Sequence, residues 1–212
     1  MALTIRLGLW QLERGRAKTQ QAQLQQQFDA APLTPWQGEV GESVWQRRFL
    51  VSGSWYPQGQ ILLDNRVHHA IAGYYVLTPL LMDDGRLLPV VRGWVARGSK
   101  GLPAIAPVSG RVSLNVRMLS PEQRFIELAK QTTDGTVWQN YQQQRYSAWL
   151  GRPVVAALAY QLEGKDELAR DWPRPDFGAD RHYGYAGQWF LFAGLALVLF
   201  LYFHWKTKSN AS

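Results

Sequence analysis

Four histidines are the side chains of this sequence best suited to bind a metal, and His182 is the strongest candidate among them. It comes just before an apolar run, near the expected start of a helix at a membrane surface. A neutral imidazole there can supply an axial nitrogen to the iron of a porphyrin. The porphyrin would lie against Tyr185 and Trp189, and Arg181 would pair with its propionates. Residue type and position alone favour a plainer role for His182, as an interfacial anchor or a helix N-cap.

The other three histidines are poorer ligand candidates. His204 lies at the far end of the apolar run beside Lys206, where an imidazole that snorkels to the opposite interface is the simpler interpretation. It follows His182 by 22 residues, which is about 33 Å along a helix, so the two cannot bind one iron. His68 and His69 are adjacent, so on a strand their side chains would point to opposite faces and could not form a paired metal site.

The sequence offers little for catalysis. It has no cysteine, and it carries no Gly-x-Ser-x-Gly motif, phosphate loop or histidine-rich metal signature. Asp83 and Asp84 are paired carboxylates, but they precede a glycine in a turn pattern and are best explained as turn residues. Without cysteine, and with three methionines, the chain also lacks the soft ligands of a copper chaperone. We therefore expect a protein that is not an enzyme.

The net charge of +7 does not indicate nucleic-acid binding, because the basic residues are dispersed along the chain. Anionic lipid headgroups or ligands that carry carboxylates explain the excess more simply. Two arginines, Arg66 and Arg92, could bind a partner, although a buried structural role is favoured for both.

The candidate site is organised by a predicted membrane span from Tyr183 to Trp205. This stretch contains no Asp, Glu, Lys or Arg, and a helix of its length can cross a hydrocarbon core of roughly 30 Å. Aromatic residues lie at both of its ends and Lys206 and Lys208 follow it, as expected at membrane interfaces. A buried core helix is the alternative, but core helices seldom stay apolar on every face for so long.

The rest of the sequence predicts an α+β fold. Residues 3–28 have a helical pattern, and period-two alternation begins near residue 44. Helices are expected over 120–131 and 136–150, each opened by a capping-box pattern. Strands are expected over 47–54 and 60–65, paired as a hairpin, and then over 73–81, 87–95, 111–119 and 154–162. Short connections favour an antiparallel meander or small barrel over a parallel sheet.

The predicted organisation is one β-rich domain and one anchor. The expected parts are an N-terminal helix (1–30), a β-rich domain with two helices (31–163), a linker (164–182), the transmembrane helix (183–205) and a short tail (206–212).

Four short motifs extend this interpretation. They are Leu7-Gly-Leu-Trp-Gln-Leu-Glu-Arg; Asp64-Asn-Arg with Gly73-Tyr-Tyr-Val-Leu-Thr-Pro; Arg92-Gly-Trp; and His182-x-x-Tyr-Ala-x-Gln-Trp-Phe. In this order and spacing the chain resembles the Surfeit-locus family of cytochrome c oxidase assembly factors, over nearly its whole length.

The resemblance implies a protein of a bacterial or mitochondrial inner membrane whose β-rich domain faces the periplasm or the intermembrane space, and we expect the bacterial inner membrane with a periplasmic domain. It implies a chaperone role in assembling the haem a centre of the respiratory oxidase, with the oxidase core subunit and the haem a synthesis machinery as partners. It also assigns haem binding to the histidine of the last motif, which is His182 here. A cofactor-free scaffold that holds oxidase subunits remains the alternative.

One feature departs from the family pattern. Family members are expected to carry a membrane span before the Leu-Gly-x-Trp-Gln motif, and this sequence has six residues there. Either the true start lies upstream or that span has been lost. We expect the first helix to be the end of a membrane span, since the β-rich domain otherwise has no evident export route.

Overall fold

The computed structural model describes residues 2–98, 101–121, 133–172 and 178–209. The chain forms two compact units. One consists of residues 28–172 and contains all the strands, and the other combines residues 1–27 with residues 173–212.

Five strands of the 28–172 unit close into a barrel. Around the ring the order is β2, β6, β9, β5 and β4, and β4 returns to β2 through the pairs Ser54–Leu81 and Trp55–Leu80. All pairs of the ring are antiparallel except β5 with β9, so the barrel is mixed. The strands are β2 (Arg48–Trp55), β4 (Ile71–Leu81), β5 (Leu87–Ala96), β6 (Arg111–Leu119) and β9 (Leu158–Gln161). The α+β class and the small barrel expected from the sequence are confirmed.

The barrel is filled by branched apolar side chains, because residues of each strand alternate between its two faces. Every strand of the ring contributes to one buried cluster. Its members include Val51, Leu80, Val90, Val116 and Ala159, each at most 1% exposed. Closure also leaves no long unpaired edge within the ring.

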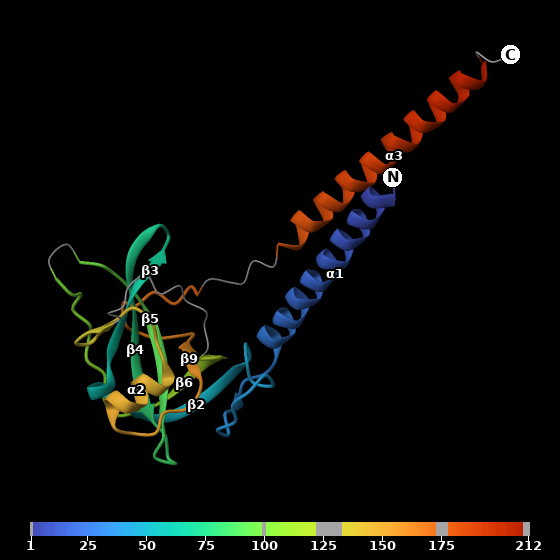
Figure 1. Cartoon of the computed structure of the whole chain (residues 1–212). Helices are drawn as coiled ribbons and strands as arrows, with labels where there is room; N and C mark the ends of the chain where they lie inside the picture. Colours follow the sequence, from blue (N-terminus) through green and yellow to red (C-terminus); the bar gives the residue numbers. More distant parts are fainter. Residues whose placement is uncertain (1, 99–100, 122–132, 173–177, 210–212) are drawn as a thin grey trace. The chain divides into compact units, whose positions relative to one another are not determined.

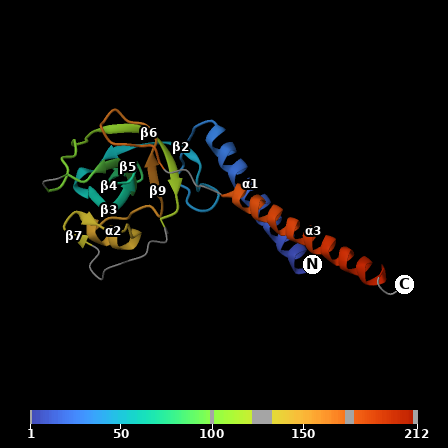
Figure 2. The same ribbon diagram turned by 90° about the horizontal axis from the view of Figure 1, so that it is seen from above.

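Smaller elements extend the barrel on one side (Figures 1 and 2). Strand β3 (Ile61–His68) pairs with β4, and two short strands, β8 (Val137–Trp138) and β7 (Thr133–Asp134), follow it. Helix α2 (Gln143–Leu150) packs its buried Tyr146 onto the ring of Trp138, and the Tyr146 hydroxyl donates to the carbonyl of Gly59. At the opposite end of the strand order, β1 (Thr34–Pro35) adds a short parallel pair to β2.

The predicted hairpin between residues 47–54 and 60–65 is wrong. Both segments are strands, but each pairs with β4 and not with the other. The end of β2 pairs with Leu80 and Leu81, and β3 pairs antiparallel with residues 71–77. Between them the 3-10 turn η1 (Pro57–Gly59) bends the chain, and the Tyr56 amide donates to the carbonyl of Pro79 at 2.9 Å. The turn therefore forms a corner of the barrel, where sequence alone suggested a reversal.

The other elements match the predictions to different degrees. The hairpin of 73–81 and 87–95 is confirmed as β4 and β5, and 111–119 is confirmed as β6. The helix expected from residue 136 begins at Gln143, because Val137 and Trp138 pair instead with β3. Its end is correct, since Gly151 adopts a left-handed conformation (φ 62°). The strand expected over 154–162 is shorter, and the helix expected over 120–131 lies outside the described residues.

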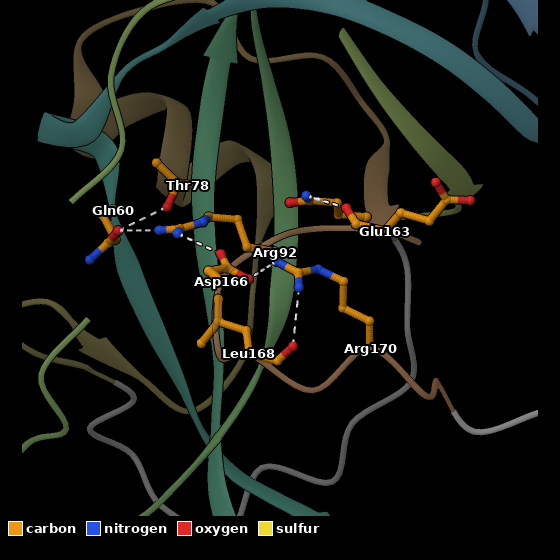
Figure 3. Close-up of polar contacts among 8 residues, drawn as sticks. Gln60, Thr78, Arg92, Glu163, Asp166, Leu168 and Arg170 are labelled. Carbon is orange, nitrogen blue, oxygen red and sulfur yellow. Dashed lines mark hydrogen bonds and ion pairs between the residues drawn. The ribbon is translucent and has the colours of Figure 1, made fainter. Parts of the chain in front are cut away.

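Arg92 is the extra residue of a β-bulge in β5. Val76 pairs with Gly93 and Leu77 pairs with Val91, so Arg92 has no partner residue on β4. A bulge can redirect a side chain, and here the side chain of Arg92 is directed at the carboxylate of Asp166. The guanidinium of Arg92, 1% exposed, donates to Asp166 at 2.9 Å and to Gln60 at 3.3 Å, and Gln60 also accepts from Thr78 (Figure 3).

The Arg92-Gly-Trp motif of β5 holds residues 166–172 against the barrel. Arg92 pairs with Asp166, a Cβ on Gly93 would lie 2.5 Å from the Cβ of Leu168, and Trp94 exchanges two backbone hydrogen bonds with Ala169. Farther along, the indole of Trp172 donates to the carbonyl of Gln161 at 2.8 Å. Residues 166–172, which were expected in the linker, thus belong to the barrel unit, and we call them the returning segment.

The second unit consists of two long helices. Helix α1 (Ala2–Ala30) confirms the predicted helix over 3–28, and α3 (Ala179–Ser209) contains the predicted span. Among the described residues, only one helical stretch, Ala179–Lys206, is long and apolar enough to cross a membrane. The two helices lie side by side in both views and run in opposite directions (Figures 1 and 2).

The buried charge of Arg92 leads to a stability prediction. Burial alone would raise the pKa of Asp166, but hydrogen bonds and charges from Arg170 and Arg92 hold it below the ordinary value. The ion pair therefore stabilises the fold at neutral pH, and its contribution is lost as pH falls through that lowered pKa. Asp166→Asn should lower the free energy of unfolding at neutral pH by about 3 kcal/mol, because Arg92 would be buried without a counter-charge.

The measurement is urea unfolding of the full chain followed by tryptophan fluorescence. Asp83→Asn is the matched control, since the Arg111–Asp83 pair is exposed on both sides, and it should change stability little. Equal effects of the two substitutions would contradict the role assigned to Arg92.

Candidate functional site

The two helices of the second unit pack aromatic rings against glycines. A Cβ at Gly8 would lie 2.7 Å from the ring of Phe190, and one at Gly15 would lie 2.9 Å from the ring of Tyr183. The glycines are seven residues apart, and so are the two aromatic residues. Seven residues are nearly two helical turns, so the two glycines lie on one face of α1 and the two aromatic residues lie on one face of α3. The helices can therefore approach closely along these faces.

His182 lies beside this seam and contacts α1. Its Nδ1 is 2.7 Å from Oε1 of Gln11, and one residue further on the hydroxyl of Tyr183 is 3.1 Å from that of Thr19. Gln11 belongs to the first motif of the sequence and His182 to the last. The two motifs, at opposite ends of the chain, therefore meet at one imidazole.

The contact with Gln11 determines what the imidazole can offer. An amide oxygen only accepts hydrogen bonds, so Nδ1 carries the proton and donates it. In the neutral ring this leaves Nε2 with a free lone pair, on the side of the imidazole away from Nδ1. Fixing one nitrogen by a hydrogen bond so that the other can bind a metal is the usual arrangement of histidine ligands.

The four predicted site residues share one face of α3. At 100° per residue, Arg181, Tyr185, Trp189 and His182 fall within an arc of about 100°. Tyr185 is 52% exposed, and Trp189 and His182 are half-buried. The adjacent face is closed against α1, since Ala186 and Ala193 are buried. His182 thus stands at the border between the packed seam and an open aromatic face, an arrangement that fits a flat apolar ligand.

His204 lies at the other end of α3, as the sequence indicated. Its ring stacks on that of Phe200, with centroids 6.0 Å apart. Along a helix it remains about 33 Å from His182.

The statement that His68 and His69 point to opposite faces is wrong. They stand at the end of β3, where His69 and Ala70 both have positive φ (45° and 63°) and form a two-residue turn into β4. The turn brings the two rings to a centroid distance of 4.2 Å, and both face Asp171. Strand geometry failed here because the chain leaves the strand between the two residues.

The two motif arginines have structural environments. Arg92 is the buried partner of Asp166 described above. Arg66 donates to the carbonyl of Gln139 at 3.0 Å and lies over the ring of Tyr75, and burial lowers its pKa more than nearby groups raise it. The Asn65 that precedes it has φ 58° at a second bulge. The central motifs therefore build the barrel.

Comparison with protein families matches residues 1–194 to the SURF1 family. The chain belongs to the SURF1 family. Its members are membrane-bound assembly factors of cytochrome oxidase and are not enzymes. The match includes Gln11 and His182 and ends inside α3, before His204. No curated protein matches the chain.

Sequence reasoning missed Gln11 as a partner of His182. The motif that contains Gln11 was identified, but Gln11 lies 171 residues before His182, and no local sequence pattern indicates a contact between residues so far apart. The available signal was the matching spacing of Gly8 and Gly15 on one helix and of Tyr183 and Phe190 on the other, which is typical of two closely packed helices.

The glycine seam predicts the effect of larger residues on this SURF1 protein. Replacing both Gly8 and Gly15 by Leu should move α1 and α3 apart by about 2 Å, the range of interaxial distances set by contact side chains. Because the sequence has no cysteine, spin labels can be placed at the exposed positions Ala17 and Gln188 and their distance measured by pulsed EPR.

Gly187→Leu combined with Gly194→Leu is the matched control, because a Cβ at either position meets nothing within 4 Å. An unchanged distance distribution in the Gly8/Gly15 variant would show that the helices do not pack through these glycines.

Proposed function

We propose that this SURF1 protein binds haem a during maturation of the oxidase core subunit, with Nε2 of His182 as an axial ligand of the iron. The observation that carries the proposal is the hydrogen bond of His182 to Gln11, which engages Nδ1 and leaves Nε2 available for a metal, on a helix with exposed aromatic side chains nearby. Haem a is here a cargo, received from the haem a synthesis machinery and passed to the oxidase. What the chain supplies is a nitrogen ligand, an apolar surface and a cation.

Each residue of the face has a defined task in this proposal. Tyr185 and Trp189, one and two turns along α3 from His182, would contact the porphyrin plane. Arg181, at the start of the helix, would pair with a propionate at the membrane interface. Half exposure of these side chains suits a ligand that must leave again, since a fully enclosed site would retain it.

The proposed location is the bacterial inner membrane with the barrel on the periplasmic side. The apolar stretch Ala179–Lys206 supports the membrane anchor, and the start of α3 would then lie at the periplasmic interface with His182. Membrane lipid surrounds the helix in this arrangement, and no role for nucleic acid is proposed.

The central prediction compares two histidines on one helix. His182→Ala should abolish the Soret band of the purified protein and lower the haem a content of the oxidase, while oxidase subunits stay near normal levels. His204→Ala makes the same chemical change at the far end of α3 and should preserve both. Absorption spectra of the purified protein and of membranes provide the measurement.

Arg181→Ala should weaken haem binding less than His182→Ala. An ion pair at a wet interface contributes about 1 kcal/mol or less, whereas loss of an iron ligand removes a coordinate bond. A cofactor-free scaffold predicts the reverse pattern, in which His182→Ala is silent and disruption of the barrel at Arg66 or Arg92 loses oxidase subunits. Normal haem a content in the His182→Ala strain would reject the haem proposal.

Gln11 provides a second, independent test. Gln11→Leu removes the acceptor for Nδ1 and should weaken haem affinity about 10–100-fold, the usual cost of losing a partner that orients a histidine ligand. Gln11→Glu keeps an acceptor oxygen and should retain most of the affinity. Titration of the full chain with haem in detergent measures both, and equal affinities for the Leu and Glu variants would contradict the orienting role of Gln11.

A further inference from the structure

The turn between β3 and β4 places two imidazoles beside a carboxylate. Nε2 of His68 is 3.1 Å from one oxygen of Asp171, and Nε2 of His69 is 2.9 Å from the other. The three potential ligand atoms all lie within 4.8 Å of one another. Two distant parts of the barrel unit, the turn and the returning segment, supply them.

The backbone of the turn is what makes the two histidines converge. Positive φ at both central positions is the geometry of tight hairpin turns, which normally use Asn-Gly or Gly-Gly. Here the positions hold His69 and Ala70, and alanine in particular rarely adopts a positive φ. An extended backbone would separate adjacent side chains, so the turn is the reason that His68 and His69 face the same carboxylate.

Asp171 is held in place by its neighbours on both sides. Ala169 is bonded to Trp94 through two backbone hydrogen bonds, and the indole of Trp172 is bonded to Gln161. The ring of Trp94 also lies 4.8 Å from that of His68. The carboxylate is therefore presented by a fastened segment, and the cluster is formed before any ligand arrives.

We propose that His68, His69 and Asp171 form a binding site for a divalent first-row metal ion, and that it binds Zn²⁺ and Cu²⁺ best. Two imidazole nitrogens and one carboxylate oxygen are a donor set for these ions, whereas Mg²⁺ and Ca²⁺ prefer oxygen ligands. Metal–ligand bonds of about 2.0–2.1 Å with tetrahedral angles place ligand atoms roughly 3.4 Å apart. The ligand atoms now lie up to 4.8 Å apart, so binding requires rotations of the exposed side chains that shorten the largest separation by about 1 Å.

The exposure of the three side chains indicates that a bound metal ion would be accessible to solvent and could exchange. The side chain of His68 is 16% exposed, that of His69 is 76% exposed and that of Asp171 is 57% exposed. Three protein ligands leave a coordination position open for water or for a donor from another molecule. Structural zinc sites, in contrast, use four protein ligands and are closed.

Binding of Zn²⁺ to the full chain in detergent tests the site, with isothermal titration calorimetry as the readout and a purification tag that contains no histidine. We expect one equivalent of Zn²⁺ per chain, and tighter binding of Cu²⁺ in the same position, following the general order of affinities. His68→Ala, His69→Ala and Asp171→Asn should each weaken Zn²⁺ binding at least about tenfold.

His182→Ala and His204→Ala are the matched controls, because they remove the two other histidines of the sequence. They should leave Zn²⁺ affinity unchanged. Zn²⁺ binding that survives in the His68→Ala/His69→Ala double variant, or that is unaffected by Asp171→Asn, would overturn the site. Absence of saturable Zn²⁺ binding in the native chain would also contradict the proposal, and would mean that the two histidines only form hydrogen bonds with Asp171.

A second readout uses Trp94. Paramagnetic Cu²⁺ at the site should quench part of the tryptophan fluorescence, because Trp94 lies against His68. The Trp94→Phe variant should bind Cu²⁺ with a smaller quenching amplitude. Undiminished quenching in that variant would place the Cu²⁺ elsewhere.

Discussion

The buried pair of Arg92 and Asp166 determines where the chain leaves the barrel. A bulge in β5 directs the guanidinium at the carboxylate, and the next two residues of the same motif fasten Leu168 and Ala169. Because a buried guanidinium requires its counter-charge, the returning segment cannot take another path without a large loss of stability. Asp171 owes its position beside His68 and His69 to this fastening.

Local signals predicted those parts of the fold that depend on local chemistry. The Asp-Asp-Gly turn, the alternation of residues 111–119 and the glycine after α2 gave the β4–β5 hairpin, strand β6 and a helix end. Failures occurred where distant contacts decide. No hairpin forms after β2, because the amide of Tyr56 donates instead to the carbonyl of Pro79 on β4. The capping pattern before Trp138 does not start a helix, because Trp138 pairs with β3 and its indole is buried there. A positive φ at His69 likewise has no sequence signature, since glycine is absent from the turn.

The motifs of the SURF1 family divide into two groups in this structure. The central motifs build the barrel, through the bulges at Asn65 and Arg92 and the close packing of Gly73 against Trp94. The terminal motifs meet at His182 and Gln11, in the other unit, none of whose described residues belongs to the buried clusters of the barrel unit. The first group explains how a cysteine-free domain holds together. The second places a histidine of defined tautomer on an apolar helix, and this is the arrangement on which the proposed haem chemistry depends.

Identification of the iron ligand tests that proposal most directly. Pulsed EPR of the full chain, labelled with ¹⁵N-histidine and loaded with ferric haem a in detergent, detects nitrogens bound to the iron through their magnetic couplings. We expect a coupling from one histidine nitrogen that disappears in His182→Ala and persists in His204→Ala. The same coupling in the His182→Ala protein, or no histidine coupling in the loaded native chain, would contradict it.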